Sequence, residues 1–185
     1  MKGRDLTVDS IETKPSKRTP SAPFTTSTLQ QEASVKLGYS VSRTMSVAQK
    51  LYESGHITYM RTDSTNLSET ALNGAAAEII SSYGEDYSKP TKYATKSASA
   101  QEAHEAIRPS NFGAIQVSDN RDEQKLYDLI RKRTLASQMA PAQLEKTTVK
   151  LSGAPNQHLF TARGEVIVFD GFLKVYAASF IDEEE

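Results

Sequence analysis

Tyr59, Arg61 and Asp63 occupy alternate positions of the segment ITYMRTDS, residues 57–64. Alternate side chains of an extended strand share a face, so we expect the phenol, the guanidinium and the carboxylate to project together, with Asp63 holding Arg61. A free phenol titrates near ~10 and is a poor nucleophile at neutral pH unless a cation favours its ionised form. A fixed guanidinium does this and also neutralises charge on phosphoryl oxygens in a transition state. The segment therefore predicts a site that attacks phosphate.

The same three residues fit a plainer interpretation. Tyr59 would then be an ordinary half-buried strand tyrosine, and Arg61 and Asp63 would form a surface ion pair. The spacing alone is compatible with both hypotheses.

A second candidate segment is AQEAHEAIRPS, residues 100–110. Residues 100–108 predict a short helix ended by Pro109, which places His104 and Arg108 on one face. His104 could bond a phosphate oxygen or shuttle a proton, and Arg108 could grip a phosphate, whereas Glu102 and Glu105 would orient their neighbours. A lone helical histidine is also commonly a structural hydrogen-bonding residue.

Helical patterns flank both segments. Gly38, Gly55 and Gly84 mark the ends of the first three helices, and the second presents an apolar stripe of Met45, Ala48, Leu51 and Tyr52. The order of helix, Gly55 and strand would hold Tyr59 on a rigid base. Thr25, Thr26 or Ser27 can cap the first helix, and Asp119 or Asn120 the fourth. The four predicted helices cover residues 25–37, 42–53, 68–83 and 121–139.

Alternating apolar and polar residues predict β structure near both ends of the chain. A strand is expected within residues 1–14, and residues 14–23, with three prolines, predict an extended linker. Residues 84–99 predict a long surface loop. The later predicted strands are 147–151, 159–162, 166–169 and 173–176, with a turn at 154–156 and bends at Gly164 and at 170–171.

These elements predict a mixed α and β fold in which a mainly α-helical domain is inserted into a discontinuous β-rich domain. Residues 1–14 would pair with part of 145–181. The predicted domains are residues 1–22 (a β segment and linker), 23–143 (the helical domain) and 144–185 (the returning β segment with an acidic tail).

Composition excludes several classes of protein. The chain of 185 residues has no cysteine, which excludes disulfides and cysteine-ligated zinc and fits a reducing compartment. It has no apolar run of about 18 residues and no signal-peptide core, so we expect a cytoplasmic protein with no membrane partner. The net charge is −1, but Asp182–Glu185 supply the negative sign and the rest is mildly basic, which weakly favours nucleic acid.

Four separated segments resemble, in the same order, the type IA DNA topoisomerases. They are PFTTSTLQQEA (23–33), ITYMRTDSTNL (57–67), AQEAHEAIRPS (100–110) and the stretch 160–176. Met60 after the tyrosine is more similar to the bacterial topoisomerase I branch than to the topoisomerase III branch, where proline is expected. The resemblance covers most of the helical region and part of the terminal β region.

This resemblance implies a function for each candidate residue. Tyr59 would attack a phosphodiester in a single-stranded segment of negatively supercoiled DNA and keep the 5′ phosphate as a phosphotyrosine. Arg61 would bind the scissile phosphate, Asp63 would support it, His104 would contact the same region, and Arg108 would contact DNA. The helical domain would carry the tyrosine and connect through a two-pass β arch, with hinges near residues 14–23 and Pro141.

The resemblance also implies a magnesium-binding acidic domain, marked by an Asp-x-Asp-x-Glu pattern that this sequence lacks. We therefore expect no metal ligand in this chain, Mg²⁺ in the intact enzyme, and an inactive fragment that needs the remaining domains of the same polypeptide. The intact enzyme is expected to be a monomer associated with the bacterial nucleoid. The alternatives are a non-catalytic module that binds single-stranded nucleic acid, with Tyr59 stacking a base, and a structural helical adaptor.

Overall fold

The computed structural model describes residues 6–93, 104–153 and 158–176, and its elements confirm the predicted mixture of α and β structure. Its contacts divide the chain into a sheet unit, Met1–Thr19 with Pro141–Gly171, and a helical unit, Pro20–Ala140 with Phe172–Glu185. In chain order the elements are β1 (Leu6–Arg18), α1 (Thr26–Leu37), α2 (Val41–Glu53), α3 (Glu69–Tyr83), the 3-10 helix η1 (Glu85–Tyr87), α4 (Arg121–Ser137), β2 (Ala142–Gly153), β3 (His158–Phe169) and α5 (Leu173–Tyr176).

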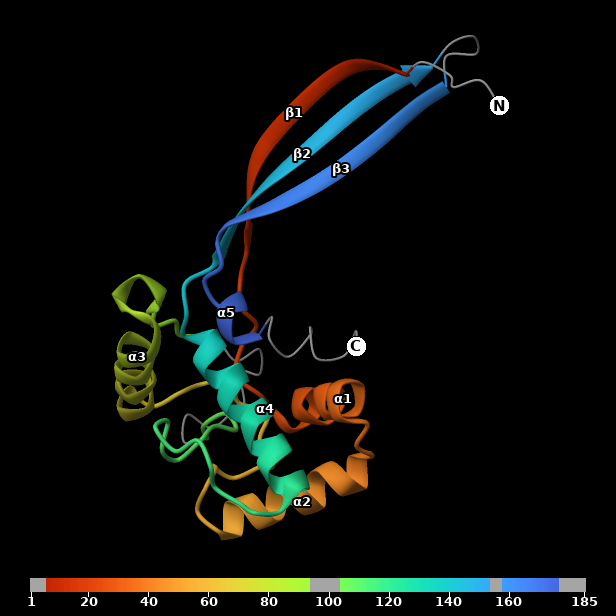
Figure 1. Cartoon of the computed structure of the whole chain (residues 1–185). Coiled ribbons are helices and arrows are strands. Elements are labelled where there is room, and N and C mark those ends of the chain that lie inside the picture. Colours follow the sequence, from red (N-terminus) through yellow and green to blue (C-terminus); the bar gives the residue numbers. More distant parts are fainter. Residues whose placement is uncertain (1–5, 94–103, 154–157, 177–185) are drawn as a thin grey trace. The chain divides into compact units, whose positions relative to one another are not determined.

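The sheet unit is a three-stranded antiparallel sheet in the order β1-β2-β3 (Figure 1). Strand β2 lies in the centre and pairs with β1 from Leu6 opposite Gly153 to Arg18 opposite Ala142. Pro15 has no amide hydrogen to donate, and its position on the outer strand β1 is one that a sheet tolerates. Strand β1 therefore pairs with residues that lie far from it in the sequence.

Three sequence predictions for the β elements are wrong. Strand β3 continues through Gly164, which pairs with Thr147, because the ladder with β2 is unbroken there. Residues 14–18 belong to β1 and are not a linker, since each has a partner on β2. Residues 173–176 form the helix α5 and not a strand. The predicted turn at 154–156 lies outside the described residues.

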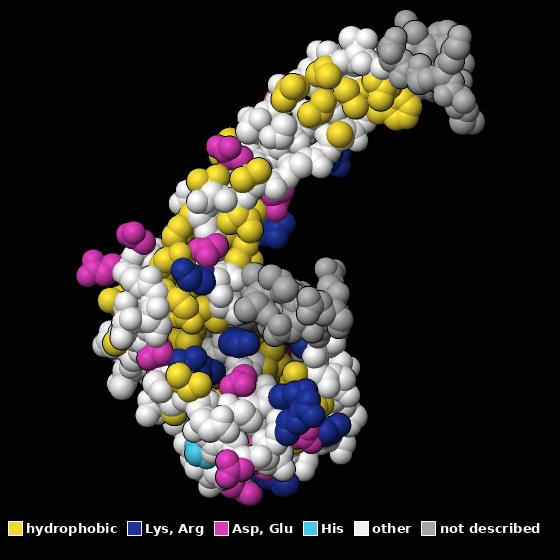
Figure 2. Space-filling model, viewed as in Figure 1, with side chains coloured by type: hydrophobic (Ala, Val, Ile, Leu, Met, Phe, Trp, Pro, Cys, Tyr) yellow, Lys and Arg dark blue, Asp and Glu magenta, His cyan; other side chains and the backbone are white. Residues whose placement is uncertain are grey.

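The sheet exposes many apolar side chains (Figure 2). Consecutive residues of a strand face opposite sides of a sheet, and three consecutive β3 residues, Val166, Ile167 and Val168, are all more than half exposed, so both faces carry exposed apolar groups. Neither hydrophobic core of the described residues includes a residue of the sheet unit. Backbone pairing is therefore the main interaction that defines this sheet.

The helical unit has α4 at its centre, with α3 on one flank and α1 and α2 on the other (Figure 1). Buried residues of α1, α2 and α4 form one core, together with Ile57, Met60 and Ile107 from the connecting segments. A second core joins α3 to the end of α4 and to α5. No helix in the described ranges is long and apolar enough to cross a membrane.

Side-chain caps fix where the helices begin. Thr25, Ser40, Ser68 and Asn120 each accept a hydrogen bond from an amide in the first turn of α1, α2, α3 and α4. The predicted caps of the first and fourth helices include Thr25 and Asn120. At the end of α1, Gly38 adopts a left-handed conformation with φ 66°, as its position after the last apolar residue predicts.

The two ends of the segment 20–140 are held close together inside the helical unit. The Tyr93 hydroxyl lies 3.0 Å from the carbonyl oxygen of Ser137 and 3.4 Å from that of Pro20. Arg133 donates from Nε to the carbonyl oxygen of Ala22 at 2.7 Å. The start of the helical unit is thereby fixed to the end of α4.

Candidate active site

Tyr59 lies in a segment without regular secondary structure, between two buried residues. Ile57 and Met60 are 2% and 1% exposed and belong to the core of α1, α2 and α4, whereas Tyr59 is 47% exposed. The chain enters this segment from α2 through Gly55, whose φ of 76° turns it away from the helix axis. The core therefore anchors the backbone on both sides of the phenol while the phenol itself faces solvent.

The predicted strand over this segment is wrong. Within the part of the chain that the structure describes, Ile57 alone in this segment makes a β-type bridge, to Pro109. Tyr59, Arg61 and Asp63 are nevertheless all exposed, and Met60 is buried. The exposure of the segment therefore alternates from Tyr59 to Arg61 without a strand assignment.

The predicted support of Arg61 by Asp63 is absent from this structure. Both side chains are exposed, and neither makes an ion pair or hydrogen bond with any residue that the structure describes. Within the described ranges, no protein group occupies the guanidinium N–H groups of Arg61.

Tyr59 and His104 line one hollow of about 310 Å³, which also includes Tyr52, Thr58, Thr62 and Glu105. His104 is exposed, so both the imidazole and the phenol are accessible from solvent. The structure thus brings together Tyr59 and His104. Arg61 follows two residues after Tyr59 and lies outside the described lining of the hollow.

The predicted helix around His104 is wrong over the described residues 104–108, and residues 100–103 lie outside the described part. Ile107 bridges to Phe24 and Pro109 to Ile57, so the segment is extended and its amides bond to other segments. His104 and Arg108 consequently do not share a helix face. Arg108 lines a separate hollow of about 460 Å³ beside α3.

Arg108 is held by Glu105 in a two-bond ion pair. Its Nε and Nη2 donate to the two carboxylate oxygens at 3.1 and 2.7 Å, and the amide of Ser68 donates to the same carboxylate at 2.7 Å. Burial alone would raise the pKa of the Glu105 carboxyl, but the hydrogen bonds from Arg108 and Ser68 outweigh burial and lower it. Glu105 therefore stays ionised and ties the segment to the start of α3.

Tyr52 was not among the predicted site residues, since the sequence placed it in the apolar stripe of the second helix. Tyr52 is 40% exposed, and its ring meets that of Tyr59 edge to face at 5.2 Å between centroids. The buried residues of α2 are Thr44, Val47, Ala48 and Leu51, so Tyr52 lies at the margin of the stripe. The position of Tyr52 in the last turn of α2, seven residues before Tyr59, was the sequence feature that could have indicated that the two rings lie close together.

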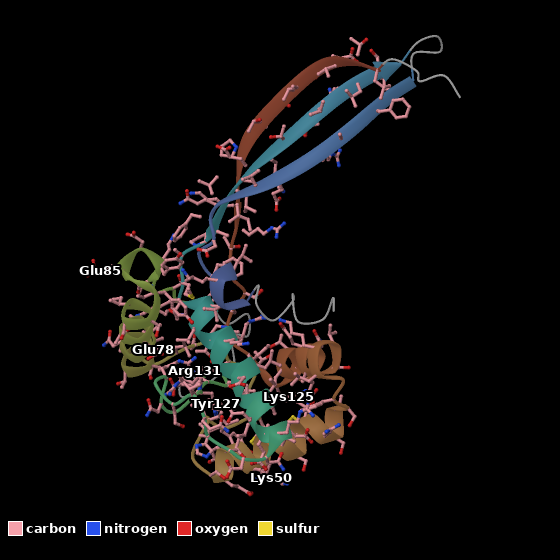
Figure 3. All side chains as sticks on the ribbon, in the orientation of Figure 1. Lys50, Glu78, Glu85, Lys125, Tyr127 and Arg131 are labelled. Atoms are coloured by element: carbon pink, nitrogen blue, oxygen red, sulfur yellow. The ribbon has the colours of Figure 1, made fainter. Side chains whose placement is uncertain are left out.

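Two further polar contacts link elements of the helical unit away from the hollow. Arg131 of α4 and Glu78 of α3 point toward one another and form an ion pair at 2.6 Å (Figure 3). The Tyr127 hydroxyl donates to the carbonyl oxygen of Ala114 at 2.7 Å, and burial raises the pKa of its phenol. Tyr127 is fully buried and bonded, in contrast to the accessible Tyr59.

The described residues do not fit a magnesium site. No group of three or more His, Cys, Asp or Glu side chains within them is arranged to hold a metal ion.

Comparisons with known proteins give a consistent result. A family model described as DNA topoisomerase matches residues 1–185. The DNA topoisomerase 1 of Streptomyces coelicolor is 53% identical over 177 residues, 91% of this chain and 19% of that protein. The DNA topoisomerase 1 of Zymomonas mobilis is 50% identical over 176 residues, 94% of this chain and 14% of that protein.

The fold has a solved counterpart. The structure of full-length topoisomerase I from Thermotoga maritima is similar with a TM-score of 0.77 and 40% sequence identity, covering 95% of this chain and 30% of that one. The chain spans less than a third of the length of each of these three relatives.

Proposed function

Because this chain belongs to the DNA topoisomerase family, whose model matches it from end to end, we propose that it is the tyrosine-bearing part of a type IA enzyme. The observation that carries the proposal is the state of Tyr59. Its phenol is 47% exposed, its neighbours Ile57 and Met60 are anchored in the core, and it shares a hollow with His104. An accessible hydroxyl on a fixed backbone is what a nucleophile requires.

The proposed reaction is a transesterification of one DNA strand. The Tyr59 oxygen attacks a phosphodiester phosphorus, the bond from phosphorus to the 3′ oxygen breaks, and the phenolic proton is lost as the 3′ oxygen gains one. The 5′ phosphate stays on Tyr59, so the energy of the broken ester bond is retained. The reverse attack by the 3′ hydroxyl reseals the strand after another strand has passed, and negative supercoils relax.

The neighbouring residues would act on the phosphate. Arg61, exposed and without an ion pair in the described part of the chain, has its donors available for a phosphate oxygen. His104, in the same hollow as Tyr59, would bond the same group or move the proton. Asp63 would support Arg61 once DNA is bound. Arg108 would contact DNA through the second N–H of Nη1 or Nη2, or after exchanging its bonds with Glu105.

The complete enzyme would need more than this chain. We propose that an acidic, Mg²⁺-binding domain of the same polypeptide supplies the rest of the site, and that a single-stranded segment of negatively supercoiled DNA is the substrate. The sheet unit would belong to a discontinuous β-rich arch domain, and the helical unit would be its inserted tyrosine domain. The division of contacts between the two units supports this organisation. The intact enzyme would act as a monomer.

A second candidate function rests on the ring pair of Tyr52 and Tyr59. Two exposed tyrosines in contact are also suited to stacking a nucleobase, so a non-catalytic module for single-stranded nucleic acid would use the same surface. Such a module would hold DNA without a covalent bond. The two functions therefore differ in one measurable product.

The test is covalent capture of labelled single-stranded DNA on denaturing gels, in a complete enzyme that carries this chain. We expect an adduct with the unchanged sequence and none with Tyr59→Phe, which removes only the attacking oxygen. Tyr83→Phe is the matched control, since it removes a phenol of α3 that does not line the hollow, and it should form the adduct normally. An adduct that persists in Tyr59→Phe would exclude Tyr59 as the nucleophile, and binding without any adduct would favour the stacking module.

A further inference from the structure

Two threonine hydroxyls bracket the segment that carries Tyr59. On the C-terminal side of Tyr59, the Thr26 hydroxyl donates to the carbonyl oxygen of Met60 at 2.7 Å and accepts from the amide of Thr62 at 2.8 Å. The Thr26 amide also donates to the carbonyl oxygen of Thr62 at 2.9 Å. Thr26 is the first residue of α1, so these bonds tie the residue after Tyr59 to the start of a helix.

On the N-terminal side of Tyr59, Thr58 connects the segment to residues 106–108. Its hydroxyl donates to the carbonyl oxygen of Ala106 at 2.7 Å and accepts from the amide of Arg108 at 3.0 Å. Its own amide donates to the carbonyl oxygen of Arg108 at 2.9 Å. Each threonine hydroxyl thus uses its hydrogen and one lone pair on two backbone groups of a different segment.

These bonds extend the backbone pairing of the Tyr59 segment. Within the described residues the segment makes one β-type bridge, at Ile57, and the Thr58 amide bond belongs to it, so regular backbone pairing does not reach the residues after Thr58. A hydroxyl that accepts from one backbone group and donates to another restrains the two peptide groups relative to its own residue. Both residues that adjoin Tyr59 take part: Thr58 through its own hydroxyl, and Met60 through its carbonyl oxygen, which accepts from the Thr26 hydroxyl.

We propose that Thr26 and Thr58 are positioning residues for the Tyr59 nucleophile. They act through the backbone: one hydroxyl on each side holds the Cα of Tyr59 so that its oxygen reaches the phosphate in line with the leaving 3′ oxygen. This role rests on the proposed function of Tyr59 and adds to it two residues whose hydroxyls are committed to backbone groups and not to substrate. It predicts a defect in the cleavage step and not in DNA binding.

The experiment measures single-turnover cleavage of labelled single-stranded DNA in a complete enzyme that carries this chain. Thr26→Val and Thr58→Val keep the shape of each side chain and remove the hydroxyl, whereas Thr26→Ser and Thr58→Ser keep the hydroxyl. Misplacing a reacting group by about 1 Å costs up to ~100-fold in rate, so we expect each valine variant to lower the cleavage rate at saturating DNA about 10- to 100-fold. The DNA concentration for half-saturation should change less than about threefold, and the serine variants should recover most of the rate.

Thr134→Val is the matched control for a general loss of stability. Thr134 is fully buried in α4, and its hydroxyl donates to the carbonyl oxygen of Ile130 at 2.9 Å, so the variant loses a comparable hydrogen bond away from the hollow. We expect it to lower the unfolding temperature without slowing cleavage. Should one valine variant fail to fold, the other tests the same claim, since each removes one of the two connections.

Distinct results would overturn the two proposals. If the unchanged enzyme forms no adduct, the function proposed for Tyr59 fails and the positioning role fails with it. If the unchanged enzyme forms the adduct but the valine variants cleave at the same rate, only the positioning role fails. A loss confined to DNA affinity, a loss that serine does not recover, or an equal loss in Thr134→Val would also contradict it.

Discussion

Tyr59 is accessible although its neighbours Ile57 and Met60 are buried. Ile57 and Met60 occupy the core of α1, α2 and α4, and this leaves the phenol between them on the surface without a flexible backbone. The alternation of side-chain types predicted that Tyr59, Arg61 and Asp63 would project together, and all three are exposed. It could not predict how the backbone is held, because hydroxyl groups from Thr26 and Thr58 make contacts that no local pattern records.

At the same scale, Glu105 predicts a pH dependence of stability. Its pKa in the folded chain is lower than the ordinary glutamate value of 4.5, so the ionised carboxylate favours the folded state above that value. This contribution is lost as the pH falls below 4.5 toward the lowered pKa. We expect Glu105→Gln to lower the unfolding temperature at neutral pH, by a difference that shrinks below pH ~4.5 because the unchanged chain then loses the same interaction.

Thermal unfolding of both chains from pH 7 to pH 3 measures this difference. Glu85→Gln is a suitable control, since Glu85 is an exposed residue of η1 with its side chain in solvent (Figure 3). A difference between Glu105→Gln and the unchanged chain that stayed constant across the range would show that the ionised pair with Arg108 does not contribute.

At the scale of elements, the helix ends were the most predictable features. Caps and glycines act locally, so Thr25, Asn120 and Gly38 could be identified without knowledge of the fold. Short segments were less predictable. Residues 104–108 contain helix-forming residues but are extended, because Ile107 and Pro109 pair with segments distant in the sequence. For such short runs tertiary contacts outweigh local preference.

The end of α1 gives a prediction at this scale. Gly38 has φ 66°, a conformation that costs a residue with a Cβ about 1–2 kcal/mol, although no atom lies within 4 Å of a Cβ built there. Gly38→Ala should therefore reduce the free energy of unfolding by that amount through backbone strain alone. Chemical denaturation measures it, with Gly113→Ala as the control.

Gly113 has an ordinary backbone conformation, and a Cβ there meets its nearest atom, the Asn111 side-chain oxygen, at 3.5 Å. Its replacement should change the free energy of unfolding by less than about 0.5 kcal/mol. Equal effects of the two substitutions would indicate that the left-handed conformation at Gly38 is not the cause.

At the scale of the whole molecule, the sheet unit and the helical unit were predicted in outline because the hydrophobic period changes from two residues to 3.6 and back along the chain. The helix α5, in which the chain returns to the helical unit after β3, was not predicted. The apolar residues at 172–176 suit a strand as well as a helix, and their inclusion in α5 depends on the core beside α3 and α4. A helix of four residues makes little more than one turn, so the helical period of its apolar residues cannot be recognised in the sequence.

The share of the relatives that this chain spans, 14% to 19% in the two curated proteins, gives the last prediction. The chain alone should neither relax negatively supercoiled plasmid nor form a covalent adduct, with or without Mg²⁺, and addition of the remaining domains should restore both. Plasmid relaxation on agarose gels and the adduct assay measure these outcomes. Relaxation by the chain alone would contradict the proposal that part of the active site lies elsewhere.

The close approach of Pro20 and Ser137, both beside the Tyr93 hydroxyl, has a consequence for the order of folding. Strand β1 must find β2 across more than a hundred intervening residues, and closing so long a loop in an unfolded chain is entropically costly and slow. Folding of the helices closes most of that loop in advance. The β2–β3 hairpin can form from local contacts, and β1 should therefore join it last, after α4 has brought the two ends of the intervening chain together.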